Sequence, residues 1–166
     1  MVPDNDSLIV SAESPHTKEC LDLLAQLLTE LSEKYPDELR GTPLIPEELA
    51  AAGAAFLVAR RDGRPVGCGA IRPFKPGVAE VKRMFVVQEA RGRGVGRAIL
   101  ENLETFATNF GYRSVRLETG LKQPEAISLY QSAGYHRAPC YGPYRENPMS
   151  VCFQKVLDAP SCRSQI

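Results

Sequence analysis

Apolar residues recur every three or four positions in three stretches of the chain, the spacing that gives a helix one apolar face. The first stretch is a leucine-rich stripe that Pro36 ends, with Ser14 as the expected N-cap and Pro15 in the first turn. The other two stretches each stop at a glycine suited to a C-terminal cap, Gly111 and Gly134. The pattern therefore predicts helices over 15–35, 96–110 and 124–133, and a further short helix over 46–52.

Runs rich in β-branched and aromatic residues, bounded by Gly, Pro and Asp, indicate strands between these helices. Asp62-Gly63 separates two such runs and is a two-residue hairpin signal. The predicted strands cover 7–12, 54–60, 65–71, 78–87, 114–119, 135–141 and 150–156. This order is typical of an α/β (α+β) fold, with a mixed, mostly antiparallel sheet of about seven strands flanked by about four helices. The unit over 78–119 is expected to be a right-handed crossover between parallel strands.

The composition is that of an ordinary globular protein: 166 residues, 43% hydrophobic and 24% charged. We expect one domain over 1–166, with its core over about 7–157 and a frayed tail over 158–166. The 20 basic and 20 acidic residues balance, which argues against a general binder of nucleic acid or of anionic membranes. No apolar run approaches the ~20 residues that span a bilayer, and the N-terminus lacks the apolar region of a signal peptide. We therefore expect a cytoplasmic protein.

The cysteines are five in number and contain no C-x-x-C pair: Cys20, Cys68, Cys140, Cys152 and Cys162. An odd, scattered set disfavours both a disulfide framework and a structural zinc site, so reduced, partly buried thiols are expected. His16 and His136 are the only histidines, which leaves little material for a metal centre or a Ser-His-Asp triad. No metal site is expected.

The segment Arg91-Gly92-Arg93-Gly94-Val95-Gly96 lies between the predicted strand 78–87 and the predicted helix that follows it. Glycines that open a helix leave backbone N–H groups accessible to an anion such as pyrophosphate, and arginines add charge-assisted hydrogen bonds. A P-loop would need Lys followed by Ser or Thr after the last glycine, where Arg97 and Ala98 stand. The dinucleotide fingerprint would need glycine at position 97 or 99, which is Arg or Ile. The pattern that remains is R-x-x-G-x-G.

This pattern resembles the acyl-CoA pyrophosphate loop of the GNAT family of N-acetyltransferases, and the resemblance extends over about residues 7–157. It implies the GNAT-like acyl-CoA N-acyltransferase fold, with acetyl-CoA as co-substrate and no metal. The cofactor-binding residues that it implies in the loop are Arg91, Gly92, Arg93, Gly94, Val95, Gly96 and Arg97. It also implies that Met84, Phe85 and Val86 pair with the pantetheine arm, on a strand that splays from its neighbour and opens a V-shaped cleft. Gln88 replaces a frequent proline, which should relax the turn without removing the phosphate site.

A second motif, from Gln123 to Tyr130, is similar to the N-x-x-A-x-x-L-Y helix of the same family. The resemblance implies that Tyr130 lies near the thioester sulfur and donates a proton to the departing thiolate. The alternative is a core tyrosine on an apolar helix face. Gln123 replaces the usual asparagine, and its side chain is a further expected cofactor contact.

An acceptor amine must lose a proton, because an ammonium has no lone pair to attack the thioester. Glu80 lies 13 residues before Arg93, the spacing of the base in the histone-acetylating branch of the family. Since many relatives deprotonate the amine through water, Glu80 either acts directly or orders a water; otherwise it forms an ion pair with Lys82 or Arg83. Strand alternation places Glu80, Lys82, Met84 and Val86 on one face unless a bulge intervenes. Backbone N–H groups near Phe85 or Val86 should bind the thioester oxygen.

Lys82 and Arg83 are unusual in a central strand, because a buried charge without a partner is costly. They pair with acids such as Glu80 and Glu118, or one of them faces the cleft and recognises an acidic group of the acceptor. Three residues of the last loop are either an acceptor wall or plain turn residues: Tyr141, Tyr144 and Arg145.

The expected function is transfer of an acetyl group from acetyl-CoA to an acceptor amine by direct attack in a ternary complex. The acceptor is a small molecule or a peptide amine: small amines, amino-acid-like molecules, antibiotics and protein N-termini or lysines all stay open, as does the acyl chain. One alternative is a non-catalytic acyl-CoA sensor. Another is a nucleic-acid-binding module, which the balanced charge disfavours. Relatives are often dimers, so a homodimer is an implied partner.

Overall fold

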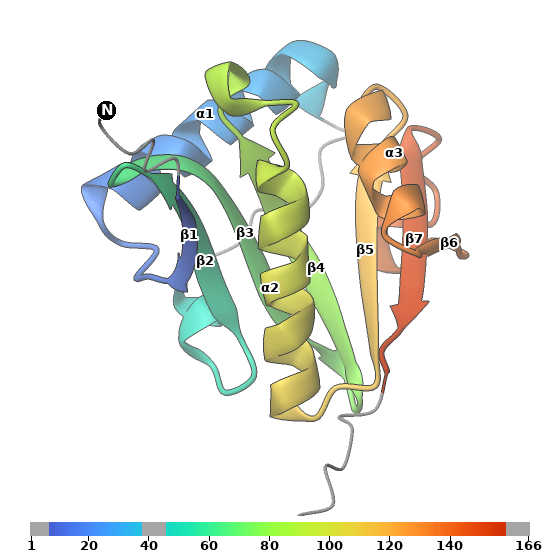
Figure 1. The fold of residues 1–166 in the computed structure, drawn as a ribbon. Helices are drawn as coiled ribbons and strands as arrows, with labels where there is room; N and C mark the ends of the chain where they lie inside the picture. The colour runs from blue at the N-terminus through green and yellow to red at the C-terminus, as the bar shows by residue number, and fades with distance from the viewer. Residues whose placement is uncertain (1–6, 38–45, 159–166) are drawn as a thin grey trace, which may run out of the picture.

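The computed structural model describes residues 7–37 and 46–158, and Figure 1 shows them as one twisted sheet covered by helices. The strands are β1 (Leu8–Ala12), β2 (Ala55–Arg61), β3 (Arg64–Lys75), β4 (Val78–Val86), β5 (Ser114–Gly120), β6 (His136–Arg137) and β7 (Ser150–Val156). The α-helices are α1 (Lys18–Lys34), α2 (Val95–Phe110) and α3 (Pro124–Ser132). Three short 3-10 helices complete the order: η2 (Pro46–Ala50), η3 (Gln88–Ala90) and η4 (Gly142–Tyr144). The predicted helix over 46–52 is therefore a 3-10 turn, and three α-helices are described instead of about four.

The sheet runs in the order β1-β2-β3-β4-β5-β7-β6. Every neighbouring pair is antiparallel except β4 and β5, which pair in parallel. The predicted mixed, mostly antiparallel sheet is confirmed. The connection between the two parallel strands contains α2, as in other crossovers of this kind.

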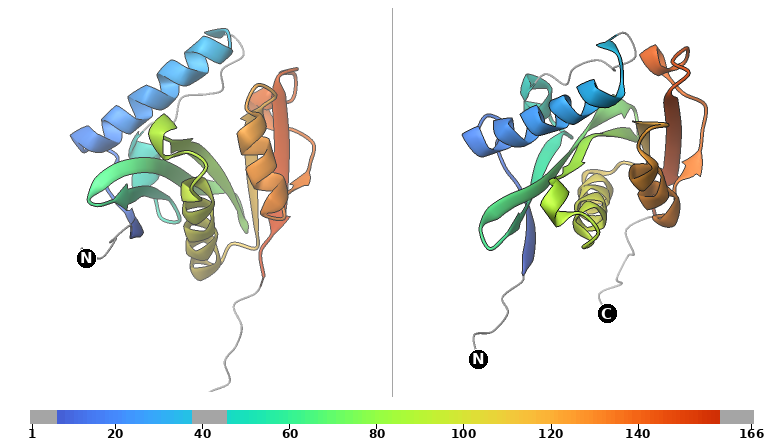
Figure 2. Two further views of the ribbon diagram at one scale, coloured as in Figure 1. Left: turned by 45° about the horizontal axis from the view of Figure 1, so that its top comes forward. Right: turned by 90° about the horizontal axis from the view of Figure 1, so that it is seen from above.

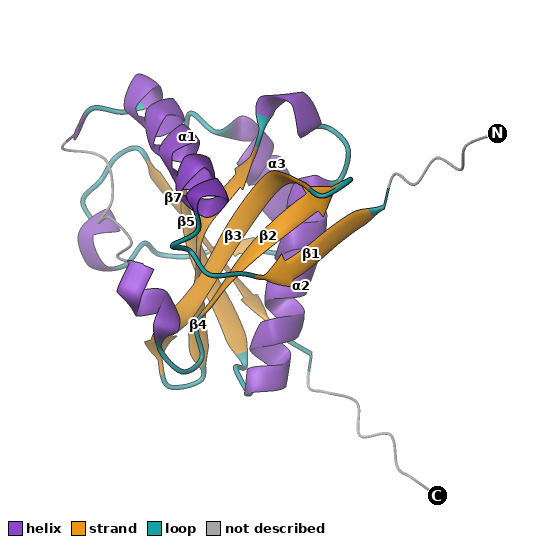
Figure 3. Cartoon of the chain, turned by 90° about the vertical axis from the view of Figure 1, so that its left-hand side faces the viewer, coloured by secondary structure: helices purple, strands orange, loops and turns teal. Residues whose placement is uncertain are grey.

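The two long helices cover opposite faces of the sheet (Figures 2 and 3). On one face, Cys20, Leu23 and Leu27 of α1 pack against strand residues that include Phe56 and Phe85. On the other face, the apolar stripe of α2 packs against the alternate strand positions; its fully buried members are Val95, Ile99, Leu100, Leu103 and Ala107. This division follows from the period of two in the strands and of 3.6 in the helices.

A β-bulge interrupts β4 in its second half. Ala70 of β3 pairs with Lys82 and Cys68 pairs with Phe85, so two residues of β4 oppose the single residue between them on β3. Arg83, inside the bulge, has a φ of +57°, which is rare for a residue with a side chain. Because of the extra residue, Lys82 and Phe85 share the α1 face. Glu80 and Lys82 share a face as alternation predicts, but the bulge, the stated exception, places Met84 and Val86 on the opposite face.

The bulge coincides with the point where β4 leaves β5. The two strands pair only from Val78 to Val81 on β4 and from Ser114 to Leu117 on β5. Beyond these residues the strands diverge, as Figure 1 shows between the labels β4 and β5. The predicted V-shaped opening is present in the backbone.

The first helix begins later than the sequence predicts. Thr17, not Ser14, is the N-cap: its hydroxyl accepts a hydrogen bond from the Cys20 N–H at 3.3 Å. Ser14 accepts from the His16 N–H instead, which forms a turn before the helix. Both residues are good caps, and Thr17 lies three positions before the buried Cys20, the spacing of an N-cap hydrogen bond. The predicted end is right, since α1 stops at Lys34 before Pro36.

The last hairpin departs most from the prediction. The expected strand over 135–141 shortens to β6, and the ladder ends after the Ala138 N–H bonds to the Cys152 carbonyl. Pro139, which has no N–H, stops the pairing. Cys140 and Cys152 then form a disulfide, so the prediction of reduced thiols is wrong for this pair. Cys20 and Cys68 are free and buried, while Cys162 and residues 159–166 of the expected tail lie outside the described residues.

Candidate active site

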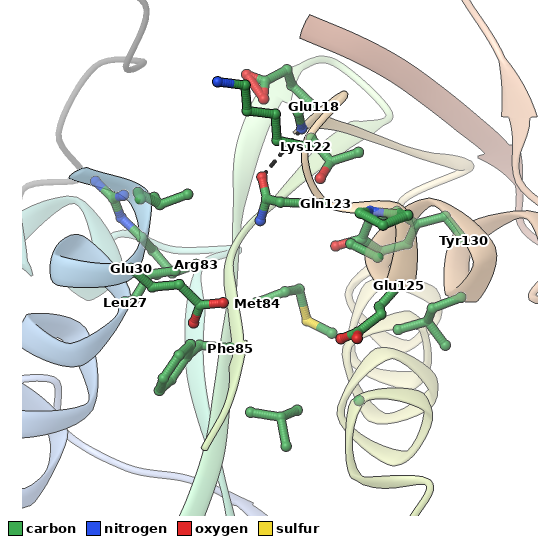
Figure 4. Close-up of a pocket in the computed structure, with 18 of the residues that line it drawn as sticks. Leu27, Glu30, Arg83, Met84, Phe85, Glu118, Lys122, Gln123, Glu125 and Tyr130 are labelled. Carbon is green, nitrogen blue, oxygen red and sulfur yellow. Dashed lines mark hydrogen bonds between the residues drawn. The ribbon is translucent and has the colours of Figure 1, made fainter. Parts of the chain in front are cut away.

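A cleft of about 1470 Å³ occupies the opening between β4 and β5. Its walls come from β4 and α1 on one side and from β5 and α3 on the other, with the start of α2 at one end (Figure 4). Residues from the loop before β7, among them Tyr144 and Asn147, line the other end. The divergence of two central strands thus forms a site at the carboxyl edge of the parallel pair.

The start of α2 offers open backbone donors. The first intrahelical hydrogen bond runs from the Ala98 N–H to the Gly94 carbonyl, so the N–H groups of 95–97 have no partner within the helix. Gly94 is the N-cap with a φ of +81°, and no side chain caps this end. A left-handed backbone here requires glycine, and nothing lies within 4 Å of the position that a Cβ would occupy. The loop is an uncovered helix N-terminus, which suits a phosphate group.

The arginines of the loop have different surroundings. Arg91 does not point freely at the loop: its Nε donates to the Val86 carbonyl at 2.9 Å and its Nη2 to Glu30 of α1 at 2.6 Å. Although burial opposes it, this contact lowers the pKa of Glu30, so the pair is ionised. Arg91 therefore ties the loop to β4 and to α1. Arg97 donates to the Ser132 hydroxyl of α3, and Arg93 is exposed.

The segment Met84–Val86 forms the floor of the cleft on the β4 side. Since β5 pairs with β4 only as far as Val81, one backbone edge of this segment has no strand beside it. Phe85 packs on the α1 face, where its ring lies 5.8 Å from the Arg91 guanidinium, and Met84 and Val86 pack towards α2. An unpaired strand edge of this kind can bind an extended amide chain by added-strand hydrogen bonds.

Tyr130 extends from α3 into the cleft (Figure 4). Its side chain is 4% exposed, and its ring contacts Tyr135 and Phe153 edge-on or tilted. Burial, with a smaller effect of Glu118, raises the pKa of the phenol well above its ordinary value of 10. The hydroxyl forms no hydrogen bond with any described residue. Tyr130 is thus a core residue whose neutral hydroxyl lies at the cleft.

Gln123 lies at the N-cap of α3 but does not cap the helix. Its Oε1 accepts from the Gly120 N–H at 3.3 Å and from the Tyr35 hydroxyl at 3.4 Å. Tyr35 closes over this corner so tightly that a Cβ at Gly120 would lie 1.9 Å from its hydroxyl. The amide oxygen of Gln123 is used within the protein, and its amide nitrogen is the part of the side chain left for a ligand.

Glu80 is 3% exposed and holds two partners. Arg72 donates to one carboxylate oxygen at 2.9 Å, and the Tyr141 hydroxyl donates to the other at 2.6 Å. Arg72 also contacts Glu48 of η2. If Glu80 had no role in catalysis, the sequence analysis expected it to form an ion pair with Lys82 or Arg83. Its ion-pair partner in the structure is Arg72.

Lys82 and Arg83 line the cleft on β4 and form no ion pair with a described acidic residue. Lys82 donates a hydrogen bond to the Tyr144 hydroxyl at 3.1 Å. Burial lowers the pKa of both side chains below their ordinary values. The sequence analysis offered ion pairs with acids such as Glu80 and Glu118 as one alternative. The structure shows no such ion pair among the described residues.

Glu118 was considered from the sequence only as an ion-pair partner, yet it faces the cleft from β5. Burial raises the pKa of its carboxyl to about 7, against the opposing charge of Lys82 and a hydrogen bond from the Ser150 hydroxyl at 3.4 Å. A period of two along β5 puts Glu118 and Arg116 on the same face, opposite the buried Leu117. This alternation along β5 was the feature of the sequence that could have predicted a carboxylate in the cleft.

The three residues considered as an acceptor wall, Tyr141, Tyr144 and Arg145, have different positions relative to the cleft. Tyr141 and Tyr144 are buried against each other, with ring centroids 5.5 Å apart and perpendicular planes. Tyr144 lines the cleft, whereas Arg145 is exposed outside it. The Cys140–Cys152 disulfide packs with the two tyrosines and ties the loop to β7.

Neither a metal-binding cluster nor a membrane-spanning helix occurs in the described part of the chain. Residues 7–37 and 46–158 contain no group of three His, Cys, Asp or Glu side chains placed to hold a metal ion. Within the same residues, no helix has both the length and the apolar character to cross a membrane.

Known proteins resemble this chain over most of its length. The model of the Acetyltransferase (GNAT) family matches residues 20–135. An IAA acetyltransferase of Azospirillum brasilense is 39% identical over 152 residues, which cover 91% of this chain and 99% of that protein. A crystal structure assigned to an acyl-CoA N-acyltransferase of Klebsiella pneumoniae has a TM-score of 0.77 and 31% identity, covering 93% of this chain and all of the other.

A third neighbour was crystallised with a ligand. The GNAT family acetyltransferase of Elizabethkingia anophelis, with acetyl-CoA bound, has a TM-score of 0.66 and covers 93% of this chain and 99% of its own. At 18% identity this likeness concerns the fold alone.

Proposed function

Because the chain belongs to the GNAT family of acetyltransferases, we propose that it transfers the acetyl group of acetyl-CoA to an acceptor amine by direct attack within a ternary complex. The observation that carries the proposal is the cleft where β4 and β5 diverge. It joins an uncovered helix N-terminus, an unpaired strand edge and a buried phenol in one continuous space.

The residues present fit acetyl-CoA along the length of this cleft. The open N–H groups of Val95, Gly96 and Arg97 suit the diphosphate, with Gly92 and Gly94 leaving the approach clear. The free edge of Met84–Val86 suits the amide groups of the pantetheine arm, and an N–H of Phe85 or Val86 would bind the thioester oxygen. When bound, acetyl-CoA supplies the thioester carbonyl that the amine attacks.

Tyr130 is the proposed proton donor. In the transfer, the amine nitrogen bonds to the thioester carbon, the carbon–sulfur bond breaks, and the electron pair of that bond goes to sulfur. The Tyr130 hydroxyl then gives its proton to the thiolate. Its raised pKa keeps the phenol protonated at neutral pH until a basic sulfur is formed beside it.

Of the carboxylates that line the cleft, Glu80 and Glu118 are the candidates to take the proton that the amine loses. Glu80, the candidate from the sequence, has both oxygens engaged by Arg72 and Tyr141, which favours a role in ordering a water over direct proton abstraction. Glu118 faces the cleft, and its pKa of about 7 is suited to a general base at neutral pH. We assign direct proton acceptance to Glu118 and water ordering to Glu80.

The test is a panel of acceptors incubated with acetyl-CoA, with release of the CoA thiol and the mass of the acetylated product as readouts. The panel contains small amines, amino acids, peptides with free N-termini or lysines, and IAA, because one relative is named for it. Transfer to at least one member supports the proposal. Saturable acetyl-CoA binding with no transfer to any member favours the acyl-CoA sensor instead.

A further inference from the structure

Two positively charged side chains line the cleft without an ion pair to any acidic residue in the described part of the chain. Lys82 and Arg83 are adjacent in β4, and both line the cleft. Neither forms an ion pair with a described residue; Lys82 has a hydroxyl, that of Tyr144, as its hydrogen-bond partner. Burial without a counter-ion disfavours a charged group, and two such groups side by side add their mutual repulsion.

The carboxylates of Glu80, Glu48 and Glu118 each contact other residues of the protein. Arg72 and Tyr141 hold the carboxylate of Glu80, and Glu48 contacts Arg72. Glu118, on the opposite wall, has a raised pKa despite the charge of Lys82, so it does not neutralise that charge fully near neutral pH. Among the described residues, no carboxylate therefore lies within ion-pair distance of Lys82 or Arg83.

The backbone of β4 has an unfavourable conformation at Arg83. Arg83 has a φ of +57° within the β-bulge, a conformation that long side chains rarely adopt. The bulge turns the chain so that consecutive residues both reach the cleft, where a regular strand would send them to opposite faces. Strain of this kind at a ligand cleft points to a functional constraint.

Lys82 and Arg83 lie away from the end of the cleft that suits the phosphates. Met84–Val86 lies between it and the loop 91–97. Tyr130 and Glu118, the proposed proton donor and acceptor, line the same cleft. An anion beside Lys82 and Arg83 would therefore belong to the acceptor and not to the phosphates of CoA.

We propose that Lys82 and Arg83 form a carboxylate subsite and that the acceptor is a small amine carrying a carboxylate, of the amino-acid type. The planar guanidinium of Arg83 matches a carboxylate in two-point geometry, and Lys82 adds a point charge held by Tyr144. With the carboxylate on β4, the amine faces Glu118 on β5. This inference rests on the proposed acetyl transfer and names the substrate class for it.

The experiment compares each amino acid with its own carboxamide as acceptor, at equal concentrations of the unprotonated amine, using acetyl-CoA as donor. We expect kcat/KM to favour the carboxylate by about ten- to a hundred-fold, the range for a charge-assisted contact. In Lys82→Met, Arg83→Gln and the double variant this preference should fall towards one. The KM for acetyl-CoA should change by no more than about threefold, since binding of the cofactor does not depend on the subsite.

Controls separate the subsite from folding and from net charge. Lys75→Met removes an exposed cation of β3 outside the cleft and should keep the preference. Arg83→Lys should restore part of it. Acetyl-CoA binding by calorimetry and thermal melting verify that each variant is folded, and the two single variants serve if the double variant is not.

The contradicting outcomes differ in what they overturn. Equal rates for carboxylate and carboxamide, or a preference that survives in the variants, overturn the subsite alone. Preference for succinyl-CoA over acetyl-CoA with neutral amines, lost in the variants, would place the anion on the donor and overturn the acceptor assignment. Acetyl-CoA binding without transfer to any amine overturns the proposed function together with the subsite.

Discussion

The Tyr141 hydroxyl donates a 2.6 Å hydrogen bond to the buried carboxylate of Glu80, joining the loop before β7 to the centre of β4. Burial and the negative charge of Glu80 raise the pKa of Tyr141, which stays a neutral donor across the physiological range. Together with Arg72, this bond fixes both oxygens of a carboxylate that the sequence alone offered as a catalytic base. The two contacts hold the Glu80 carboxylate in a fixed position beside the cleft.

Tyr141→Phe should lower the free energy of unfolding by about 2 kcal/mol, because the variant removes a buried hydrogen bond to a charged group. Urea denaturation of the wild type, Tyr141→Phe, Glu80→Gln and the double variant gives the coupling energy between the two side chains. A coupling energy below about 0.5 kcal/mol would show that the bond does not contribute, contrary to the structure.

Tyr130→Phe should lower kcat by about 10²- to 10⁴-fold while the dissociation constant of CoA stays within about threefold. The change removes only a hydroxyl, which faces the cleft and has no partner in the described protein, so the packing of the ring against Phe153 is preserved. Stopped assays of acetylated product and calorimetric titration with CoA measure the two quantities. Undiminished turnover would remove Tyr130 from the mechanism.

Glu118→Gln should abolish the limb of the kcat/KM profile that rises with pH near 7, and lower the plateau by about 10²-fold or more. Glu125→Gln is the matched control, since it removes an exposed carboxylate from the rim of the same cleft. A profile that keeps its limb in Glu118→Gln would exclude Glu118 as the base.

The same carboxyl gives a stability prediction. Its folded pKa of about 7 exceeds the ordinary 4.5, so the neutral form contributes stability that is complete below pH 4.5 and lost as the pH rises through 7. Gln does not titrate, so the stability of Glu118→Gln relative to the wild type should increase between these pH values, by at most about 3 kcal/mol. Melting curves at pH 5 and pH 8 test this, and a difference independent of pH would contradict the raised pKa.

The Cys140–Cys152 disulfide closes a short loop that contains Tyr141 and Tyr144. Replacing both cysteines by Ser should lower stability by about 3 kcal/mol, the effect of opening a loop of this length. Dithiothreitol should lower the melting temperature of the wild type and leave that of the double variant unchanged. Free thiols at both positions in the purified, non-reduced protein would contradict the bond.

The elements of this fold were predictable where local pattern decides them. The leucine stripe of α1, the glycines around α2 and the Asp62-Gly63 hairpin all act within a few residues of sequence. The sequence also located the divergence of β4 through a family resemblance. It misplaced the start of α1 because Ser14 and Thr17 are both good caps; Thr17 caps the helix, whereas Ser14 bonds to the His16 N–H in the turn before it.

The site required tertiary information that no local pattern contains. Arg91 meets Glu30 across 61 positions of sequence, and Tyr141 meets Glu80 across another 61. The bulge at Arg83 reversed the faces of the residues after it, so alternation counted from Glu80 failed. The disulfide joins cysteines that the pairing of β6 with β7 brings together, since Arg137 pairs with Phe153 and the Ala138 N–H bonds to the Cys152 carbonyl.

The central claim is that acetyl-CoA lies between β4 and β5 with its diphosphate on the N-terminus of α2. A crystal structure with CoA tests it most directly. We predict density for the diphosphate within hydrogen-bond distance of the N–H groups of Val95, Gly96 and Arg97, and for the pantetheine arm along Met84–Val86. CoA bound elsewhere, or an empty cleft at saturating CoA, would contradict the account.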